Sequence, residues 1–204
     1  MFQIIVDSAA NIPAELVKQY HIKVLSFVNY VNGEKLVCFD PELTYEEERE
    51  KGKTYYDAMR NGADVKTSLI STGDFEAAFR KVMEDGEDVL YFSLSKNISG
   101  TYNSARIAME GLMENPPMGR KIRIIDALNA SLAQGILAIY ASEMRNKGME
   151  IDEVYDILKT YPAKMNGVFT VGDLKCILAK CCERSEQQLN QAAITIFYSS
   201  LVRI

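Results

Sequence analysis

The fold is decided by residues 88–105, which read DVLYFSLSKNISGTYNSA. The apolar run at 88–92 predicts a buried strand, and the apolar spacing after Ser104 predicts a helix. A loop of hydroxyl side chains around Gly100 joins the two. Such a junction directs backbone N–H groups and the positive end of the helix dipole into one small volume. Hydroxyls beside it can donate hydrogen bonds, so the loop is suited to hold the oxygen-rich head of a ligand.

Polar residues also stand at the boundaries of other predicted strands and helices. They are Asp7-Ser8, the segment Thr67-Ser68-Leu69-Ile70-Ser71, and Asp126 with Ser131. In open α/β sheets, ligands bind outside the carboxyl ends of the strands. Asp7, Ser95 and Asp126 each fall at such an end, so we expect these segments to be partners of the hydroxyl loop.

Strand-like and helix-like patterns alternate along the whole chain. Strands are predicted at residues 3–6, 22–31, 35–39, 89–92 and 123–126, and helices at 12–20, 44–60, 73–83, 102–114, 131–147 and 152–161. Asn11 is the expected N-cap of the first helix. Asn32-Gly33 predicts a hairpin turn. The helix at 44–60 is expected to start loosely around residues 51–53. The alternation predicts an α/β fold with a mainly parallel sheet and helices on both faces.

The composition of the chain argues against some classes of binding partner. The 204 residues are 48% hydrophobic and 25% charged, which is typical of a globular protein. A net charge of −5 without a basic cluster argues against nucleic acid, because phosphate contacts need a positive face. The N-terminus predicts a strand rather than a signal peptide, and no apolar run is long enough to span a bilayer. We therefore expect a cytoplasmic protein with reduced cysteines and no integral membrane segment.

Neither a metal site nor a nucleotide-binding motif is predicted. The cysteines are Cys38, Cys176, Cys181 and Cys182, and the last three lack the usual spacing of metal ligands. The only histidine, His21, lies far from them in the sequence. We expect the cysteines to be small packing residues. The sequence contains neither G-x-x-x-x-G-K-S/T nor G-x-G-x-x-G, so no nucleotide fold is indicated.

Four segments resemble motifs of the DegV family of bacterial fatty-acid-binding proteins. Residues 5–13 are similar to the opening D-S…D-L-P block, 67–71 with Phe75 to T-S-x-P-S…F, 95–105 to S-S-x-L-S-G-T-Y-x-S-A, and 126–135 to D-S…S-x-G-x-G. Three positions depart from these motifs, where Ile70 replaces proline, Lys96 the second serine and Ala133 the first glycine. Each motif is short, but their order and approximate spacing are kept, and the resemblance covers about residues 3–180.

The resemblance weakens toward the end of the chain. After Lys180, where the family has a G-G-R-I-S turn, residues 181–185 read CCERS. Family members continue beyond this point and complete a second domain, which supplies much of an acyl tunnel wall, an arginine and a histidine. The resemblance therefore implies a DegV-like α/β domain at residues 1–160. At 161–204 it implies the start of an incomplete second α/β domain, the lipid-covering domain, with a divergent tail.

Within that second domain, residues 168–171 predict a strand and 174–180 a short helix. The divergent tail also leaves open that the chain is a fragment, which would be unable to bind lipid without its missing C-terminal part.

The resemblance implies a carrier rather than an enzyme. Family members are similar in holding one long-chain fatty acid, with its carboxylate at the domain junction and its tail in a buried apolar tunnel. They present it to a separate fatty acid kinase subunit, which phosphorylates it. The bound fatty acid is then the ligand, and no cofactor is implied.

The family motifs also assign roles to individual residues. Thr67 and Ser95 are the hydroxyls expected to contact the carboxylate, with Ser68, Ser99 and Gly100 as further ligand-binding residues. Asp7, Ser8, Asp126 and Ser131 are expected to orient the binding groups from behind. This chemistry suits a fatty acid, because burial of the tail contributes roughly 0.8 kcal/mol per CH₂. The carboxylate is costly to bury unless donors satisfy it.

Other interpretations of the same residues remain open. Ser99 and its neighbours are also typical of a helix cap, as is Ser131, and Thr67 with Ser68 is typical of a loop end. A different functional class is a serine hydrolase or a phosphotransfer subunit built on the same loops. No G-x-S-x-G elbow occurs, and His21 is expected at the surface, without a serine or cysteine motif to serve as a base.

Overall fold

The computed structural model describes residues 1–167, and Met1–Met165 form one compact unit. The predicted strand at 168–171, the predicted helix at 174–180 and three of the cysteines, Cys176, Cys181 and Cys182, lie outside the described residues. Nearly all of the expected second domain at 161–204 does so too, and the division into two domains stays a prediction.

A four-stranded parallel sheet forms the centre of this unit. Its strands are β1 (Phe2–Asp7), β2 (Ile22–Leu25), β6 (Asp88–Ser93) and β7 (Ile122–Asp126), in the order β2-β1-β6-β7. Every neighbouring pair is parallel, with Ile4 of β1 opposite Ile22 and Leu90. All four carboxyl ends therefore meet at one edge of the sheet, and the predicted α/β fold is confirmed.

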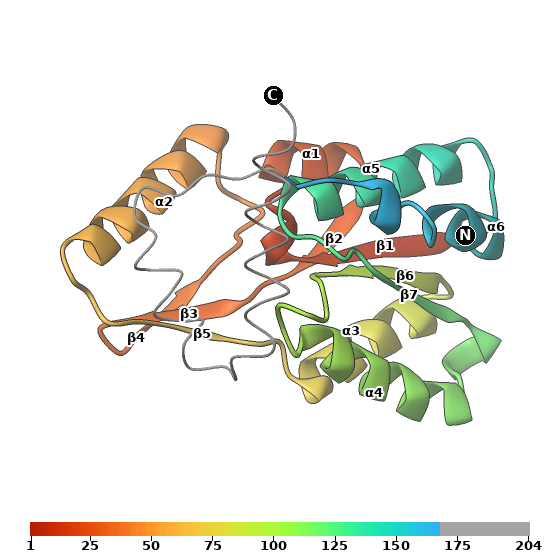
Figure 1. Ribbon diagram of the computed structural model, residues 1–204. Helices are drawn as coiled ribbons and strands as arrows, with labels where there is room; N and C mark the ends of the chain where they lie inside the picture. The colour runs from red at the N-terminus through yellow and green to blue at the C-terminus, as the bar shows by residue number, and fades with distance from the viewer. Residues whose placement is uncertain (168–204) are drawn as a thin grey trace. The chain divides into compact units, whose positions relative to one another are not determined.

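Helices cover both faces of the parallel sheet (Figure 1). One face carries α1 (Ala14–Gln19), α5 (Leu132–Asn146) and α6 (Ile151–Leu158), and the other carries α3 (Thr72–Glu84) and α4 (Thr101–Glu114). Side chains alternate between the two faces along each strand. Ile4 and Val6 thus enter the core with α5, whereas Ile5 enters the core with Phe75 and Phe79 of α3. This burial on both sides explains why these strands are near-continuous apolar runs.

A second, antiparallel sheet corrects one of the strand predictions. Residues 22–31 do not form a single strand, because β2 ends at Leu25 and β3 (Val28–Val31) begins another sheet. This sheet has the order β4-β3-β5, with β4 (Glu34–Val37) and β5 (Val65–Ser68). The Ser8 hydroxyl accepts a hydrogen bond from the Phe27 N–H, and the Ser26 hydroxyl accepts one from Phe39 N–H. Side chains thus bind the backbone where it passes from one sheet to the other.

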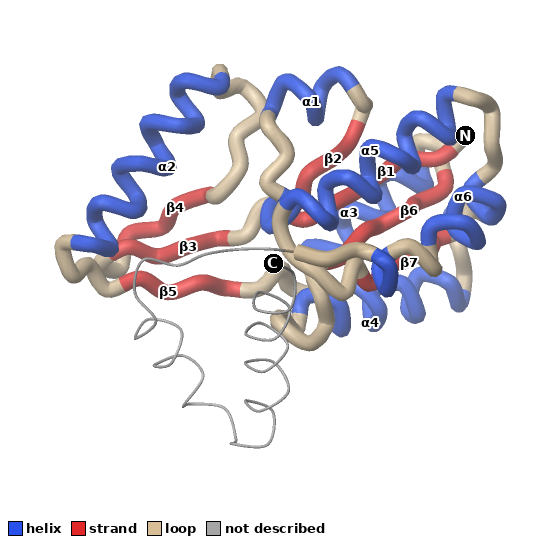
Figure 2. Tube along the Cα trace, turned by 45° about the horizontal axis from the view of Figure 1, so that its top comes forward, coloured by secondary structure: helices blue, strands red, loops and turns tan. Residues whose placement is uncertain are grey.

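The predicted hairpin joins β3 to β4. Asn32 and Gly33 have φ values of 52° and 86°, as the favoured two-residue hairpin turn requires. Beside these strands lies α2 (Tyr45–Arg60), as Figure 2 shows. Thr44 and Glu47 form a capping box at its start, and the helix then runs without a break. The expected loose start around residues 51–53 is therefore wrong.

The remaining elements are short, and they correct the predicted start of the first helix. Within residues 1–167, 3₁₀ turns occur at η1 (Ser8–Ala10), η2 (Pro117–Gly119) and η3 (Pro162–Lys164). Asn11 is not the N-cap of α1, which begins after Pro13. Asn11 instead ends η1 with a φ of 50° and donates its N–H to the Ser8 carbonyl, because asparagine tolerates this left-handed conformation. No helix within residues 1–167 is long and apolar enough to cross a membrane.

Candidate functional site

Two carboxylates hold the loop between β6 and α4 from its two sides. This loop, residues 94–100, is named the hydroxyl loop below. Asp7, at the end of β1, accepts a hydrogen bond from the Leu94 N–H through Oδ2, at 2.9 Å. Asp126, at the end of β7, accepts one from the Lys96 N–H through Oδ1, at 3.3 Å. The structure thus brings Asp7, Ser95 and Asp126 together, as the parallel order of the strands predicts.

Ser95 lies at the centre of the hydroxyl loop and organises it. Its side chain is buried, and its Oγ accepts a hydrogen bond from the Asn97 N–H at 3.3 Å. Its carbonyl accepts from the N–H groups of Ile98 and Ser99, and its own N–H donates to the Asn129 carbonyl. A hydroxyl that accepts one hydrogen bond retains its proton for donation to another group.

Ser99 contacts the first residue of α4. Its Oγ accepts from the Thr101 N–H at 3.2 Å and is hydrogen-bonded to the Thr101 hydroxyl at 2.8 Å, where either oxygen can be the donor. These contacts are those of the capping interpretation, and a role in ligand binding stays a prediction. Gly100 has an ordinary φ of −69°, so its backbone does not require glycine. A Cβ there would lie 3.3 Å from Cδ2 of Leu69, so the Leu69 side chain lies close to this glycine.

Thr67 and Ser68 belong to strand β5 rather than to a loop. Thr67 is exposed and lies opposite Asn29 of β3, and the Ser68 hydroxyl donates to the Val28 carbonyl at 3.3 Å. The interpretation of these two residues as a loop end is therefore wrong. The chain continues directly into Leu69, whose side chain packs against Gly100. The segment after β5 and the hydroxyl loop are thus neighbours, although they come from different sheets.

Asp7 is inaccessible to solvent, and all its hydrogen bonds are internal. Its Oδ1 accepts from the Ala9 N–H at 3.1 Å, and its Oδ2 accepts from the Tyr91 hydroxyl at 2.8 Å as well as from Leu94. Burial raises the pKa of this carboxyl above its ordinary value of 3.8, and the hydrogen bonds oppose that rise. Asp7 therefore joins the ends of β1 and β6 through its hydrogen bonds.

Asp126 and Ser131 organise the loop between β7 and α5. Asp126 also accepts from the Leu128 N–H at 3.0 Å, and the Lys96 ammonium lies 3.8 Å from its Oδ2. Ser131 stands at the N-cap position of α5, but its hydroxyl makes no capping bond to the helix. It accepts instead from the Asn11 side chain at 2.9 Å. Ser131 has a φ of 57°, which is strained for a residue with a side chain.

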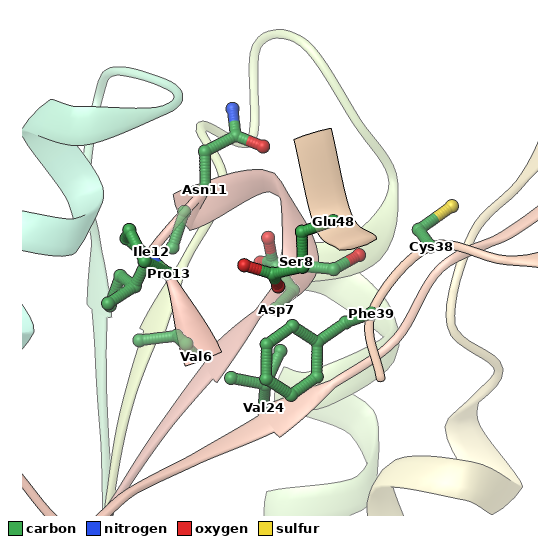
Figure 3. Close-up of a pocket in the computed structure, with 11 residues that line it drawn as sticks. Val6, Asp7, Ser8, Asn11, Ile12, Pro13, Val24, Cys38, Phe39 and Glu48 are labelled. Atoms are coloured by element: carbon green, nitrogen blue, oxygen red, sulfur yellow. The ribbon is translucent and has the colours of Figure 1, made fainter. Parts of the chain in front are cut away.

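A pocket of about 190 Å³ lies beside the end of β1 (Figure 3). Its walls are Val6, Asp7, Ser8, Ala10, Asn11, Ile12, Pro13, Val24, Cys38, Phe39 and Glu48. Figure 3 shows oxygen atoms of Asp7, Ser8 and Glu48 near one another, above the ring of Phe39. Glu48 is bound to the start of α1, where its Oε2 accepts from the Ala14 N–H at 3.4 Å. Two of the predicted supporting residues, Asp7 and Ser8, line this pocket, whereas Thr67 and Ser95 do not.

Large apolar side chains border the hydroxyl loop and remain accessible to solvent. Leu69, Ile98, Leu128 and Leu132 are exposed by 51%, 53%, 46% and 63%. They come from the segments that follow β5, β6 and β7 and from the first turn of α5. Single exposed leucines are ordinary, but these four belong to chain segments that converge on one edge. We name this set the apolar rim.

Some residues that shape the site were not identified from the sequence. Tyr91 and Gln134 are both inaccessible to solvent and lie beside Asp7. The signal for Tyr91 was a tyrosine in an otherwise apolar buried strand, because a buried tyrosine hydroxyl needs a hydrogen-bond partner. No comparable signal existed for the apolar rim, since exposure of a loop residue depends on the tertiary fold.

His21 lies away from this edge. It is exposed, as predicted, and it directly precedes β2, so it stands at the amino end of the parallel sheet. The hydroxyl loop is at the carboxyl end, and His21 is therefore not placed to act as a base there. Within residues 1–167, no group of three or more histidine, cysteine or acidic side chains is arranged to hold a metal ion.

Comparison with known proteins identifies relatives of this chain. A family model described as "Uncharacterised protein, DegV family" matches residues 1–180. A DegV domain-containing protein of Clostridium perfringens is 37% identical over 174 residues, which make up 85% of this chain and 57% of that protein. The chain thus spans little more than half the length of this curated relative.

Two solved structures from Thermotoga maritima have a similar fold. One, a DegV lipid-binding protein, has a TM-score of 0.66 at 30% identity, over 80% of this chain and 55% of its own. The other is described as revealing a fatty acid binding function. Its TM-score is 0.63 at 31% identity, over 77% of this chain and 53% of its own.

Proposed function

This chain belongs to the DegV family, and on that basis we propose that it binds one long-chain fatty acid. The carboxylate is held by hydroxyl groups at the carboxyl edge of the parallel sheet, and the acyl chain lies in an apolar tunnel that begins at the apolar rim. Two solved relatives that are described as binding lipid or fatty acid support the ligand class. No further cofactor is part of this proposal.

One observation carries the proposal, namely the contact between Leu69 and Gly100. Through this contact, the segment that follows Thr67 lies against the loop that contains Ser95. Hydroxyl donors and exposed apolar side chains thereby occur on the same segments. A fatty acid needs this combination, because its two ends require unlike surroundings.

The head group is assigned to Thr67 and Ser95, with Ser68, Ser99 and Gly100 beside them. The exposed hydroxyl of Thr67 and the retained proton of Ser95 provide donors. Ser99 and Ser68 already bind the backbone, so they contribute less. Hydrogen bonds to a carboxylate contribute more than those between neutral groups.

The charges around the loop permit an anionic ligand. Asp126 is paired with the Lys96 ammonium, and burial raises the pKa of Asp7, which disfavours its negative charge. Lys96 thus offsets the charge of Asp126, one of the two acids that bind the loop. Asp7, Ser8, Asp126 and Ser131 act in this proposal by holding loops in place.

We further propose that the chain is a carrier, which presents its fatty acid to a fatty acid kinase, and is not itself a catalyst. The position of His21 at the opposite end of the sheet supports this assignment, because a nucleophilic serine needs an adjacent base. A carrier role also accounts for the assignment, within residues 1–167, of hydroxyl groups rather than basic side chains to the carboxylate.

Native mass spectrometry of the 204-residue chain purified from bacteria tests the proposal. We expect either a co-purified acid or a mass increase of one ligand when hexadecanoic or octadecenoic acid is added. Short acids such as hexanoic acid serve as the control and are expected to give no stable complex, because each missing CH₂ removes about 0.8 kcal/mol. A bare polypeptide that takes up no long-chain acid would contradict the proposal.

A further inference from the structure

The ring of Tyr91 lies in the hydrophobic core, but packing of the core does not require its hydroxyl group. Its ring packs against Phe75 and Phe79, with centroids 5.1 and 5.9 Å apart. A phenylalanine ring would fill the same space in this cluster. The hydroxyl is also inaccessible to solvent, and it donates to Oδ2 of Asp7 at 2.8 Å. We infer from this geometry that Tyr91 is a positioning residue for the hydroxyl loop and acts through Asp7.

The connection from Tyr91 to Ser95 is short and is made of hydrogen bonds. Oδ2 of Asp7 receives two donors, the Tyr91 hydroxyl and the Leu94 N–H. Leu94 is the residue before Ser95, so the orientation of the Asp7 carboxylate sets where the loop leaves β6. Oδ1 is bound to the Ala9 N–H, so the Ala9 N–H and the Tyr91 hydroxyl together fix the orientation of the carboxylate.

Gln134 of α5 holds the same strand end from another side. Its Nε2 donates to the Phe92 carbonyl at 3.0 Å, and the whole side chain is buried. The Ser95 N–H is in turn bound to the Asn129 carbonyl at 3.1 Å. Three backbone sites within residues 92–95, on Phe92, Leu94 and Ser95, are therefore held by partners from three different parts of the fold.

Loss of the Tyr91 hydroxyl would leave the Asp7 carboxylate with fewer donors in a buried place. A buried acceptor without its partner is costly, so the carboxylate would move toward other donors. The Leu94 N–H would move with it, and the Ser95 hydroxyl would lose its alignment with a ligand head. This inference rests on the proposed binding of a fatty acid, and it adds a residue that sets how well the carboxylate is recognised.

The test compares two ligands that differ only at the head. Dissociation constants of hexadecanoic acid and of 1-hexadecanol are measured for the 204-residue chain and for Tyr91→Phe. The tail contribution is common to both ligands, so the ratio of the two constants reports on the head group alone. We expect wild type to bind hexadecanoic acid more tightly than 1-hexadecanol. In Tyr91→Phe, the ratio that expresses this preference should fall about fivefold, as expected for one weakened hydrogen bond.

Ser142→Ala is the matched control. Ser142 is also buried, and its hydroxyl donates to the Tyr20 carbonyl at 2.7 Å, near the amino end of β2. This variant loses a buried hydroxyl too, but we expect it to keep the wild-type ratio. Equal losses of preference in both variants would mean a general effect of instability and would overturn the inference.

The amide signal of Leu94 in NMR spectra gives a second readout. We expect a larger shift of this signal in Tyr91→Phe than in Ser142→Ala, because only the former alters its acceptor. An unchanged Leu94 signal together with an unchanged ligand preference would overturn the inference and leave fatty acid binding intact. If wild type bound neither ligand, the proposed function and this inference would both be wrong.

Discussion

At the scale of single residues, the two predicted head-group hydroxyls have different surroundings. Ser95 is buried within a network of loop hydrogen bonds, whereas Thr67 is exposed on β5. Neither side chain supports the two hydrophobic cores. Ligand binding and folding should therefore respond separately to changes at these positions.

The double variant Ser95→Ala/Thr67→Ala tests the head-group assignment. We expect weaker binding of hexadecanoic acid by about 2–3 kcal/mol, because two hydrogen bonds to a charged group are lost. Displacement of a fluorescent fatty acid measures the affinity, and far-ultraviolet circular dichroism checks the fold. Thr54→Ala, which removes an exposed hydroxyl from α2, is the control and should bind normally. Wild-type affinity in the double variant would refute the assignment.

Because the pKa of Asp7 is shifted in the folded protein, we expect the stability of the protein to depend on pH in a defined direction. Burial raises its pKa in the folded state above the ordinary value of 3.8, so the folded protein retains a proton that the unfolded chain releases. The contribution of Asp7 to stability is therefore complete below pH 3.8 and is lost as the pH rises through the folded-state pKa.

Urea unfolding of wild type and Asp7→Asn at a series of pH values measures this effect. The difference in unfolding free energy, wild type minus variant, should decrease as the pH rises above 3.8 and then become constant. Subtraction removes the titration of groups that both proteins share. A difference that increases with pH in this range would show that the pKa of Asp7 is lowered instead.

At the scale of elements, the strands and helices with a regular apolar pattern were predictable. The point at which the chain passes from one sheet to the other was not. The strands β1, β6 and β7 and the helices α3, α4 and α5 were predicted within a few residues, because each has a strong period and buries a continuous apolar face. β5 was missed, because its sequence VKTS has little apolar content and its residues are partly exposed. The break at Ser26-Phe27 depends on contacts with Ser8 and Phe39, which local patterns do not contain.

The candidate site was also only partly predictable from the sequence. The meeting of Asp7, Ser95 and Asp126 followed from strand order, because parallel strands place their carboxyl ends together. The contact between Leu69 and Gly100 and the role of Tyr91 did not follow, since each joins residues from separate elements whose distance only the fold defines.

Alanine substitutions at two helical glycines are expected to change stability in opposite directions. In α5, a Cβ on Gly135 would lie 2.9 Å from Cγ1 of Ile12 and 3.0 Å from the Ala10 carbonyl oxygen. We expect Gly135→Ala to destabilise the protein by about 1–3 kcal/mol, because backbone must move. In α4, no atom lies within 4 Å of a Cβ on Gly111, so Gly111→Ala should stabilise by about 0.5–1 kcal/mol.

Thermal unfolding of the two glycine variants measures the predicted difference. Gly111→Ala serves as the control for the general effect of alanine in a helix. Equal shifts of the unfolding midpoint in both variants would show that η1 does not approach α5 as closely as described.

At the scale of the whole molecule, the proposed binding site and the hydrophobic cores occupy different regions. The two cores lie on either face of the parallel sheet, and the hydroxyl loop and the apolar rim lie at its carboxyl edge. The chain matches little more than half the length of its curated relatives, with 57% covered in each of two of them.

A crystal structure of the 204-residue chain with hexadecanoic acid tests the central claim most directly. We predict that the carboxylate lies within hydrogen-bond distance of the Ser95 and Thr67 hydroxyls, with the first carbons of the tail against Leu69 and Ile98. A carboxylate bound elsewhere, for example in the pocket beside Ser8 and Glu48, would contradict the account.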